Sequence, residues 1–193
     1  MASRGLRRLH DYQYDAYLEY ESSSNVKHEF LDGEIYAMAG GTLEHAVIAV
    51  NVSSALSAQL RDGRWVVASS DLKLRVLATG LATYPDVTVL CGAVERDPKS
   101  RDVVLNPTLL IEVLSDSTEA WDKGEKLDHY KRIPALRECV LVSHRERRVE
   151  VVARVSGAEW TSRAAGPGET LALDSVGCAL AVDDVYRNVE LPG

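Results

Sequence analysis

The sequence predicts a mixed α/β domain with a central sheet, flanking helices and a hairpin-rich C-terminal third. Two short β-branched, apolar runs at residues 86–90 and 108–113 are typical of buried strands. Residues 43–60 have the composition and length of a long helix. Residues 166–182, which open with Gly-Pro-Gly, are typical of β-hairpins. A chain of 193 residues suits one domain, spanning residues 1–193, that buries roughly 70% of its unfolded surface.

Turn and capping residues mark the boundaries of the expected elements. A short helix is expected at residues 11–21. A hairpin at residues 26–38 follows, because Asp32-Gly33 suits the two turn positions that need positive φ. Thr42 is the expected N-cap of the helix at residues 43–60. The other expected elements, in chain order, are strands at 65–68 and 72–76, a turn at 78–83, a strand from 86, a loop at 93–107, a strand at 108–113, a helix at 119–132, strands at 138–143 and 148–155, and a helical turn at 183–186.

The composition is that of an ordinary globular protein, with 46% apolar and 26% charged residues. No run approaches the ~18 apolar residues of a membrane span, and the N-terminus lacks the apolar segment of a secretory signal. Cys91, Cys139 and Cys178 lie far apart in apolar surroundings, which predicts buried free thiols and a cytoplasmic protein. The net charge of −7 does not indicate nucleic-acid binding, but it fits a site that concentrates cations.

Two acidic residues at the edges of the apolar runs are the strongest functional signal. Asp86 opens one predicted strand and Glu112 stands near the end of the other. A buried carboxylate without a partner is unfavourable, so a pair of them suggests a divalent metal site. Mg²⁺ prefers such hard oxygen ligands, and a metal held this way can activate water for phosphodiester cleavage. The alternative is that Asp86 caps its strand and Glu112 pairs with a basic residue.

The helix after Glu112 offers further candidates. Asp122, Lys126 and Tyr130 are spaced four residues apart and share one face, which can look back toward Glu112. A lysine there could orient a metal-bound water or stabilise developing charge. The alternative is an exposed Asp122–Lys126 pair that contributes a few tenths of a kcal/mol.

His45 and Lys73 are secondary candidates. His45 shares the apolar face of its helix, so it is either a core histidine or a metal ligand or proton shuttle at the Asp86 site. Lys73 lies on an alternating strand that is expected to form a hairpin with the Asp86 strand, from which it could reach the metal. The alternative is an exposed sheet face.

The sequence gives only weak evidence for phosphate contacts and none for an organic cofactor. Most of the basic residues are interleaved with acidic ones, as on ordinary surfaces, and the sequence has no phosphate-binding glycine loop and no sign of a nucleotide or flavin cofactor. The candidate phosphate contacts are Arg4, Arg7, Arg8, Lys131, Arg132, Arg145, Arg147 and Arg148.

Taken together, these residues resemble the Uma family of restriction endonucleases, a bacterial group in the PD-(D/E)XK nuclease superfamily. The resemblance covers roughly residues 11–182. The matching pieces occur in the family's order: Phe30-Leu31-Asp32-Gly33-Glu34-Ile35-Tyr36-Ala37-Met38, His45, Tyr84-Pro85-Asp86-Val87, Ile111-Glu112-Val113-Leu114-Ser115, Ser117-Thr118, Asp122, Lys126 and Tyr130.

The resemblance implies a restriction-endonuclease-like core, a mixed sheet flanked by helices. It implies that Asp86, Glu112 and the carbonyl of Val113 bind the metal, Mg²⁺ or Mn²⁺. The superfamily pattern has lysine two residues after the glutamate, where this chain has Leu114. Lys126 is the natural replacement and Lys73 the second choice.

These features predict a magnesium-dependent DNA endonuclease with Asp86 and Glu112 on the metal, Lys126 assisting the water, and Tyr130 and His45 shaping the pocket. Cleavage of both strands of a duplex favours a homodimer, with one site for each strand. Two alternatives stay open. One is a binding module that keeps the nuclease fold without turnover, and the other is a metal-dependent hydrolase of a smaller phosphate ester.

Overall fold

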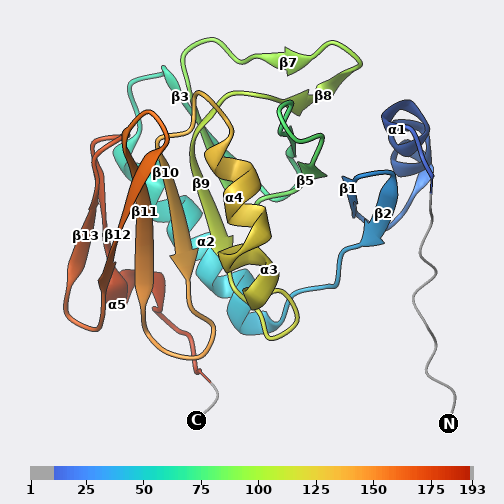
Figure 1. Cartoon of the computed structure of the whole chain (residues 1–193). Coiled ribbons are helices and arrows are strands. Elements are labelled where there is room, and N and C mark those ends of the chain that lie inside the picture. The colour runs from blue at the N-terminus through green and yellow to red at the C-terminus, as the bar shows by residue number, and fades with distance from the viewer. Residues whose placement is uncertain (1–10, 192–193) are drawn as a thin grey trace, which may run out of the picture.

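The structure is a computed structural model that describes residues 11–191, in which two six-stranded sheets and a separate hairpin are surrounded by helices (Figure 1). Arg4, Arg7 and Arg8, named above as candidate phosphate contacts, lie outside these residues. No helix within residues 11–191 has the length and apolar character needed to cross a membrane.

The first sheet forms the centre of the molecule. Its middle strands β9 and β10 run parallel, and every other neighbouring pair in it is antiparallel. The parallel pair is long and buried, which explains why residues 108–113 and 138–143 read clearly as strands in the sequence. In spatial order the strands are β12 (Glu159–Ala165), β11 (Val149–Ser156), β10 (Glu138–Val142), β9 (Pro107–Val113), β6 (Val87–Cys91) and β3 (Trp65–Ser69).

The second sheet is built from short strands. In spatial order they are β2 (Glu34–Ala37), β1 (His28–Leu31), β5 (Ala82–Thr83), β4 (Lys73–Arg75), β8 (Ser100–Val104) and β7 (Arg96–Asp97). The turn between β1 and β2 has the positive φ angles expected of it, 50° at Asp32 and 82° at Gly33.

Two expectations about this sheet were wrong. Residues 93–107 are not a loop, because β7 and β8 pair within them at the sheet's edge, where polar residues are tolerated and no apolar alternation reveals a strand. The strand containing Lys73 does not form a hairpin with the Asp86 strand, because β5 intervenes and pairs with β4, while β6 pairs with β3 and β9.

Helices cover both faces of the central sheet. The helices on these faces are α2 (Leu43–Gln59), α3 (Glu119–Lys123) and α4 (Glu125–Lys131). The short helix α5 (Val182–Val185) packs against α2, and α1 (Tyr14–Ser23) packs against β1 of the second sheet. In Figure 1, α3 and α4 lie in front of β9 and β10, and α2 lies behind them. Thr42 caps α2 as expected, since its Oγ1 accepts a hydrogen bond from the His45 N–H at 3.3 Å.

The expected helix at residues 119–132 is interrupted. Gly124, with φ −102° and ψ −106°, separates α3 from α4. Helical spacing in the sequence continues through this position, so the glycine itself was the only local sign of a break. The interruption matters for the site because Asp122 lies before it and Lys126 after it.

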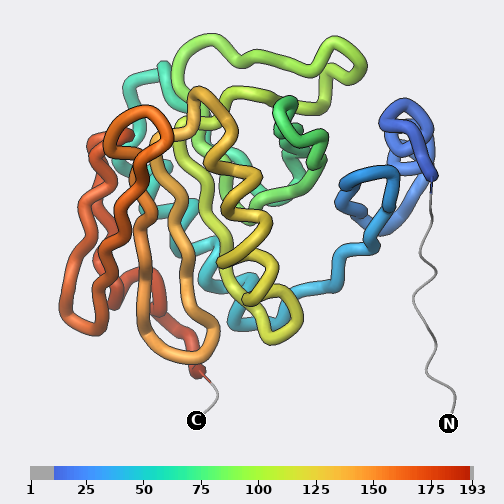
Figure 2. Tube along the Cα trace, viewed as in Figure 1, coloured from blue at the N-terminus to red at the C-terminus, as the bar shows by residue number. Residues whose placement is uncertain are grey.

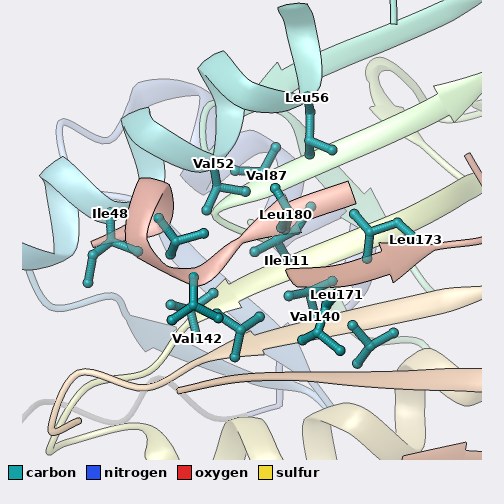
Figure 3. Close-up of a cluster of buried hydrophobic side chains, with 14 of the residues drawn as sticks. Ile48, Val52, Leu56, Val87, Ile111, Val140, Val142, Leu171, Leu173 and Leu180 are labelled. Carbon is teal, nitrogen blue, oxygen red and sulfur yellow. The ribbon is translucent and has the colours of Figure 1, made fainter. Parts of the chain in front are cut away.

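The main core lies between α2 and the central sheet (Figure 3). Ile48, Val52 and Leu56 of α2 are fully buried against residues of the sheet such as Val87 and Ile111. The C-terminal hairpin, β13 (Thr170–Leu173) and β14 (Cys178–Ala181), closes this core with Leu171, Leu173 and Leu180.

A second core lies on the opposite face of the central sheet. Leu110, Leu114 and Leu141 of the central sheet region pack there with residues of α4 and with Leu74 and Val104 of the second sheet. The two sheets are therefore joined by shared apolar packing. Figure 2 shows α1 and the β1–β2 hairpin at one side of the molecule and the C-terminal hairpins at the other.

The three cysteines are free thiols, as expected. Cys139 and Cys178 are buried, but the prediction that all three are buried was wrong for Cys91. Cys91 ends β6, where the strand leaves the core, and its side chain is exposed.

Gly124→Ala should destabilise the protein by about 1–3 kcal/mol, because the new Cβ would lie 2.8 Å from the Ala120 carbonyl oxygen, a backbone atom that cannot easily move. Urea unfolding followed by circular dichroism measures the change. Gly40→Ala is the matched control, since a Cβ there meets no atom within 4 Å. Equal stabilities of the two variants would contradict the prediction.

Candidate active site

Asp86, which directly precedes β6, lies opposite Glu112 of the neighbouring strand β9. Val87 of β6 pairs with Ile111 of β9 in antiparallel register, so extending the register by one residue sets Asp86 opposite Glu112. Side chains opposed in this way have Cβ atoms about 4.5–5.5 Å apart. Asp86 Oδ2 also accepts a hydrogen bond from the Val113 N–H at 2.7 Å. The expected adjacency of the two acidic residues is therefore found.

Strand alternation decides which way Glu112 points. Ile111 and Val113 face α2, whereas Leu110 and Leu114 pack in the core beneath α4. Glu112 lies between them in the second set and is 4% exposed. Its carboxylate is thus buried on the same side of the sheet as the polar residues of α3 and α4.

Lys126 lies against Glu112, as the helix spacing predicted. Its Nζ is 3.1 Å from Glu112 Oε1, and the side chain is 5% exposed. Nζ also lies 3.1 Å from Asp122 Oδ1, so the Asp122–Lys126 pair is buried and not the exposed pair that was the alternative. Burial alone would lower the pKa of Lys126, but the surrounding acidic groups, Glu112 first, hold it well above its ordinary value. Lys126 is therefore a charged ammonium.

Tyr130, one helical turn after Lys126, completes the environment of Glu112. Its hydroxyl donates a hydrogen bond of 2.5 Å to Glu112 Oε1. Tyr130 is fully buried, and its burial together with the charge of Glu112 raises its pKa well above the ordinary value. The Tyr130 hydroxyl and the Lys126 ammonium thus both lie against Oε1 of Glu112.

The pKa of Glu112 is raised to about 8. Burial is the largest cause, and repulsion from Asp86 and Asp122 adds to it. Lys126 and the Tyr130 hydroxyl oppose the shift without cancelling it. The site thus carries more acidic groups than its own cation offsets, an arrangement that a further cation would relieve.

His45 faces Asp86 from the first turn of α2. Its Nε2 lies 2.9 Å from Asp86 Oδ1, and the two side chains are 23% and 15% exposed. The hydrogen bond to Asp86 raises the pKa of His45, although burial opposes the shift. Nδ1 is buried and has no hydrogen-bond partner within the described residues. The histidine is therefore at the acidic site, as expected, and not in a sealed apolar core.

Lys73 does not reach this site. Leu74 pairs with Thr83 and packs in the core shared with α4, so the neighbouring Lys73 points to the other face of the second sheet. There its Nζ lies over the rings of Tyr17 and Tyr84, 5.0 and 5.4 Å from their centroids. Burial lowers the pKa of Lys73. Alternation along β4 excludes the expected approach to the carboxylates.

Sequence reasoning missed Glu29. It lies in β1, is 13% exposed, and places Oε1 3.2 Å from Lys126 Nζ. Thr83 of β5 donates a hydrogen bond to the same oxygen. The only local signal was an acidic residue within a short apolar strand, and the pairing of β1 with β5 that brings it to Lys126 joins segments 52 residues apart, Phe30 with Ala82.

The donor set of this site suits a hard divalent cation. Asp86 and Glu112 supply carboxylate oxygens, the hard ligands that Mg²⁺ and Mn²⁺ prefer. In that part of the chain no three acidic, histidine or cysteine side chains are arranged as a complete metal cage. A cation here would therefore need main-chain oxygen or water in addition to the two carboxylates.

Comparison with known proteins identifies the family of this chain. A model of the family Uma2, described as putative restriction endonuclease, matches residues 14–183. The chain belongs to the Uma2 family. Two relatives from Synechocystis sp., the uncharacterized proteins slr1290 and sll1609, are 37% and 33% identical to it over 175 and 144 residues. These alignments cover 91% and 75% of this chain, and 91% and 81% of the relatives.

A solved structure shares the fold. A crystal structure described as a putative nuclease belonging to DUF820, from Anabaena variabilis, superposes with a TM-score of 0.72 and 17% identity. The match covers 89% of this chain and 96% of the other. The mixed sheets and few helices of this Uma2 member are thus those of a restriction-endonuclease-like nuclease fold.

The raised pKa of Glu112 makes a prediction about stability. The stabilisation that the folded protein gains from holding the Glu112 proton should be fully present below pH 4.5, where the unfolded state also holds that proton. It should be lost as pH rises toward 8, at up to about 1.4 kcal/mol per pH unit. Urea unfolding of the metal-free protein from pH 5 to 8 measures this slope. Glu112→Gln should flatten it.

Glu125→Gln serves as the control for that measurement, since Glu125 is on α4 but 68% exposed. It should follow the wild-type curve. Parallel curves for the wild type and Glu112→Gln would show that burial of Glu112 does not set the slope.

Proposed function

We propose that this chain is a metal-dependent DNA endonuclease that hydrolyses phosphodiester bonds. The observation that carries the proposal is the convergence of Asp86, Glu112 and Lys126 at one end of the central sheet in a member of the Uma2 family. Two carboxylates and one ammonium are the groups such hydrolysis needs, and here a helix supplies the lysine that Leu114 does not.

Asp86 and Glu112 are proposed to hold Mg²⁺ or Mn²⁺, with the Val113 carbonyl as a third ligand. When bound, the metal would activate water and offset charge on the phosphate. Asp86 is already oriented for this role by the Val113 N–H and by His45. Glu112 is oriented by the Tyr130 hydroxyl.

Lys126 is proposed to act as a charged group that orients the attacking water and stabilises the phosphate oxygens as negative charge builds. Its raised pKa supports this role over that of a general base, because the ammonium has no free electron pair. Tyr130 and His45 are proposed to shape the pocket, Tyr130 through Glu112 and His45 through Asp86.

DNA is the proposed substrate. The turn between β10 and β11 follows the strand beside Glu112, so it lies at the same end of the sheet as the site. Arg145, Arg147 and Arg148 are exposed there and could contact phosphates. Arg145 also forms an ion pair with Asp116, which offsets part of its positive charge.

We also propose a homodimer, because cutting both strands of a duplex is simplest with two sites related by a twofold axis. Residues 1–193 would act as one domain, since both sheets contribute to the core beneath α4. Free cysteines are compatible with work in the reducing cytoplasm. Sedimentation with and without DNA tests the dimer.

The decisive experiment is cleavage of supercoiled and branched DNA with Mg²⁺ or Mn²⁺. Asp86→Ala should abolish nicking and Mn²⁺ binding by calorimetry. Lys126→Met should slow nicking about 10²-fold or more, because it removes the charge that faces the reacting phosphate. Lys73→Met is the matched control and should cleave at the wild-type rate, since Lys73 lies on the other face of its sheet.

Other outcomes identify the alternatives. Tight DNA binding with no cleavage under any metal would favour the binding module. Turnover of a small phosphate ester without DNA cleavage would favour a metal-dependent hydrolase of such esters. Loss of cleavage in Lys73→Met but not in Lys126→Met would contradict the assignment of the lysine.

A further inference from the structure

The Lys126 ammonium is shared by carboxylates from three separate segments. Glu112 comes from β9, Asp122 from α3 and Glu29 from β1, with Nζ–O distances of 3.1, 3.1 and 3.2 Å. Glu29 is therefore as close a neighbour of Lys126 as the other two, although it belongs to the other sheet.

Glu29 is itself held in place. The Thr83 hydroxyl donates to Glu29 Oε1, the oxygen that faces Lys126. Thr83 belongs to β5 and precedes Asp86 by three residues, so the chain that orients Glu29 leads directly into the proposed metal ligand. A half-buried, hydrogen-bonded carboxylate beside a buried ammonium is a fixed arrangement and not a chance surface pair.

We propose that Glu29 is a positioning residue for Lys126. Its carboxylate draws the ammonium toward the second sheet and so limits how closely Lys126 engages Glu112. Without that pull, the ammonium would shift toward Glu112 and Asp122 and away from the position at which it meets the attacking water. This inference rests on the proposed function for its catalytic consequence, but the placement of Lys126 can be tested without it.

Two rival roles for Glu29 make different predictions. If Glu29 only anchors the β1–β2 hairpin through Thr83, Glu29→Gln should change nothing, because the amide oxygen still accepts the Thr83 hydrogen bond. If Glu29 is a metal ligand, Glu29→Gln should weaken Mn²⁺ binding far more than Asp122→Asn does. Asp122→Asn is matched, since it removes a carboxylate at nearly the same distance from the same ammonium.

The first test observes Lys126 in the metal-free protein. Proton–nitrogen correlation spectra of protein with ¹⁵N-labelled lysine report ordered NH₃⁺ groups, and Lys126→Met identifies the Lys126 signal. Glu29→Gln should shift that signal or broaden it to loss through faster proton exchange with water. Asp128→Asn is the control, because it removes the partner of the nearby surface residue Lys131 and should leave the Lys126 signal unchanged.

The second test uses cleavage kinetics. Glu29→Gln should lower kcat about ten- to hundredfold with little change in KM, because it misplaces a catalytic group and not the substrate. In the Lys126→Met background, Glu29→Gln should have no further effect. Thermal unfolding of each variant checks that the fold is retained, and Glu29→Asp offers a second variant that keeps the charge and should keep part of the activity.

An unchanged Lys126 signal in folded Glu29→Gln would overturn the proposal, as would a further loss of kcat in the Lys126→Met background. A changed signal in a protein that cleaves no DNA would instead support the positioning of Lys126 and count against the proposed endonuclease activity.

Discussion

The register between β6 and β9 is the constraint on which the site depends. Pairing Val87 with Ile111 sets Asp86 opposite Glu112. Because strand side chains alternate, a slip of one residue would turn Glu112 into the α2 core and bring an apolar neighbour to the site. The fully buried side chains Val87, Val89, Leu109 and Ile111 oppose that slip. Packing of the main core thereby fixes the chemistry on the other face of the sheet.

Relocation of the lysine from strand to helix changes how the site is held together. A lysine two residues after Glu112 would share its strand, whereas Lys126 reaches Glu112 from α4. Its position depends on the break at Gly124, on the packing of α4 against Leu114, and on Glu29 from the second sheet. The site is consequently assembled from residues of α2, β1, β9, α3 and α4 and from the start of β6, so its geometry depends on the packing of both sheets.

The burial of the Glu112 carboxyl group links stability to the proposed function. Burial raises the pKa of Glu112 to about 8 even with Lys126 beside it, so the metal-free site is electrostatically unfavourable at neutral pH. A divalent cation would offset that penalty and stabilise the folded state by binding it selectively. Strain of this kind is frequent at functional sites, where groups are held for chemistry at the expense of stability.

The sequence by itself determined the strands that carry Asp86 and Glu112, the hairpin at Asp32-Gly33, the cap at Thr42 and the helix face of Lys126 and Tyr130, because each follows from local periodicity or turn chemistry. Only the tertiary structure decided that Lys73 faces away from the site and that Glu29 contacts Lys126 within it. Both depend on how β1, β4 and β5 pair across long stretches of chain, and strand pairing between distant segments leaves no local pattern in the sequence. The break at Gly124 was likewise not predicted, because helical spacing continues across it and a single glycine does not by itself end a helix.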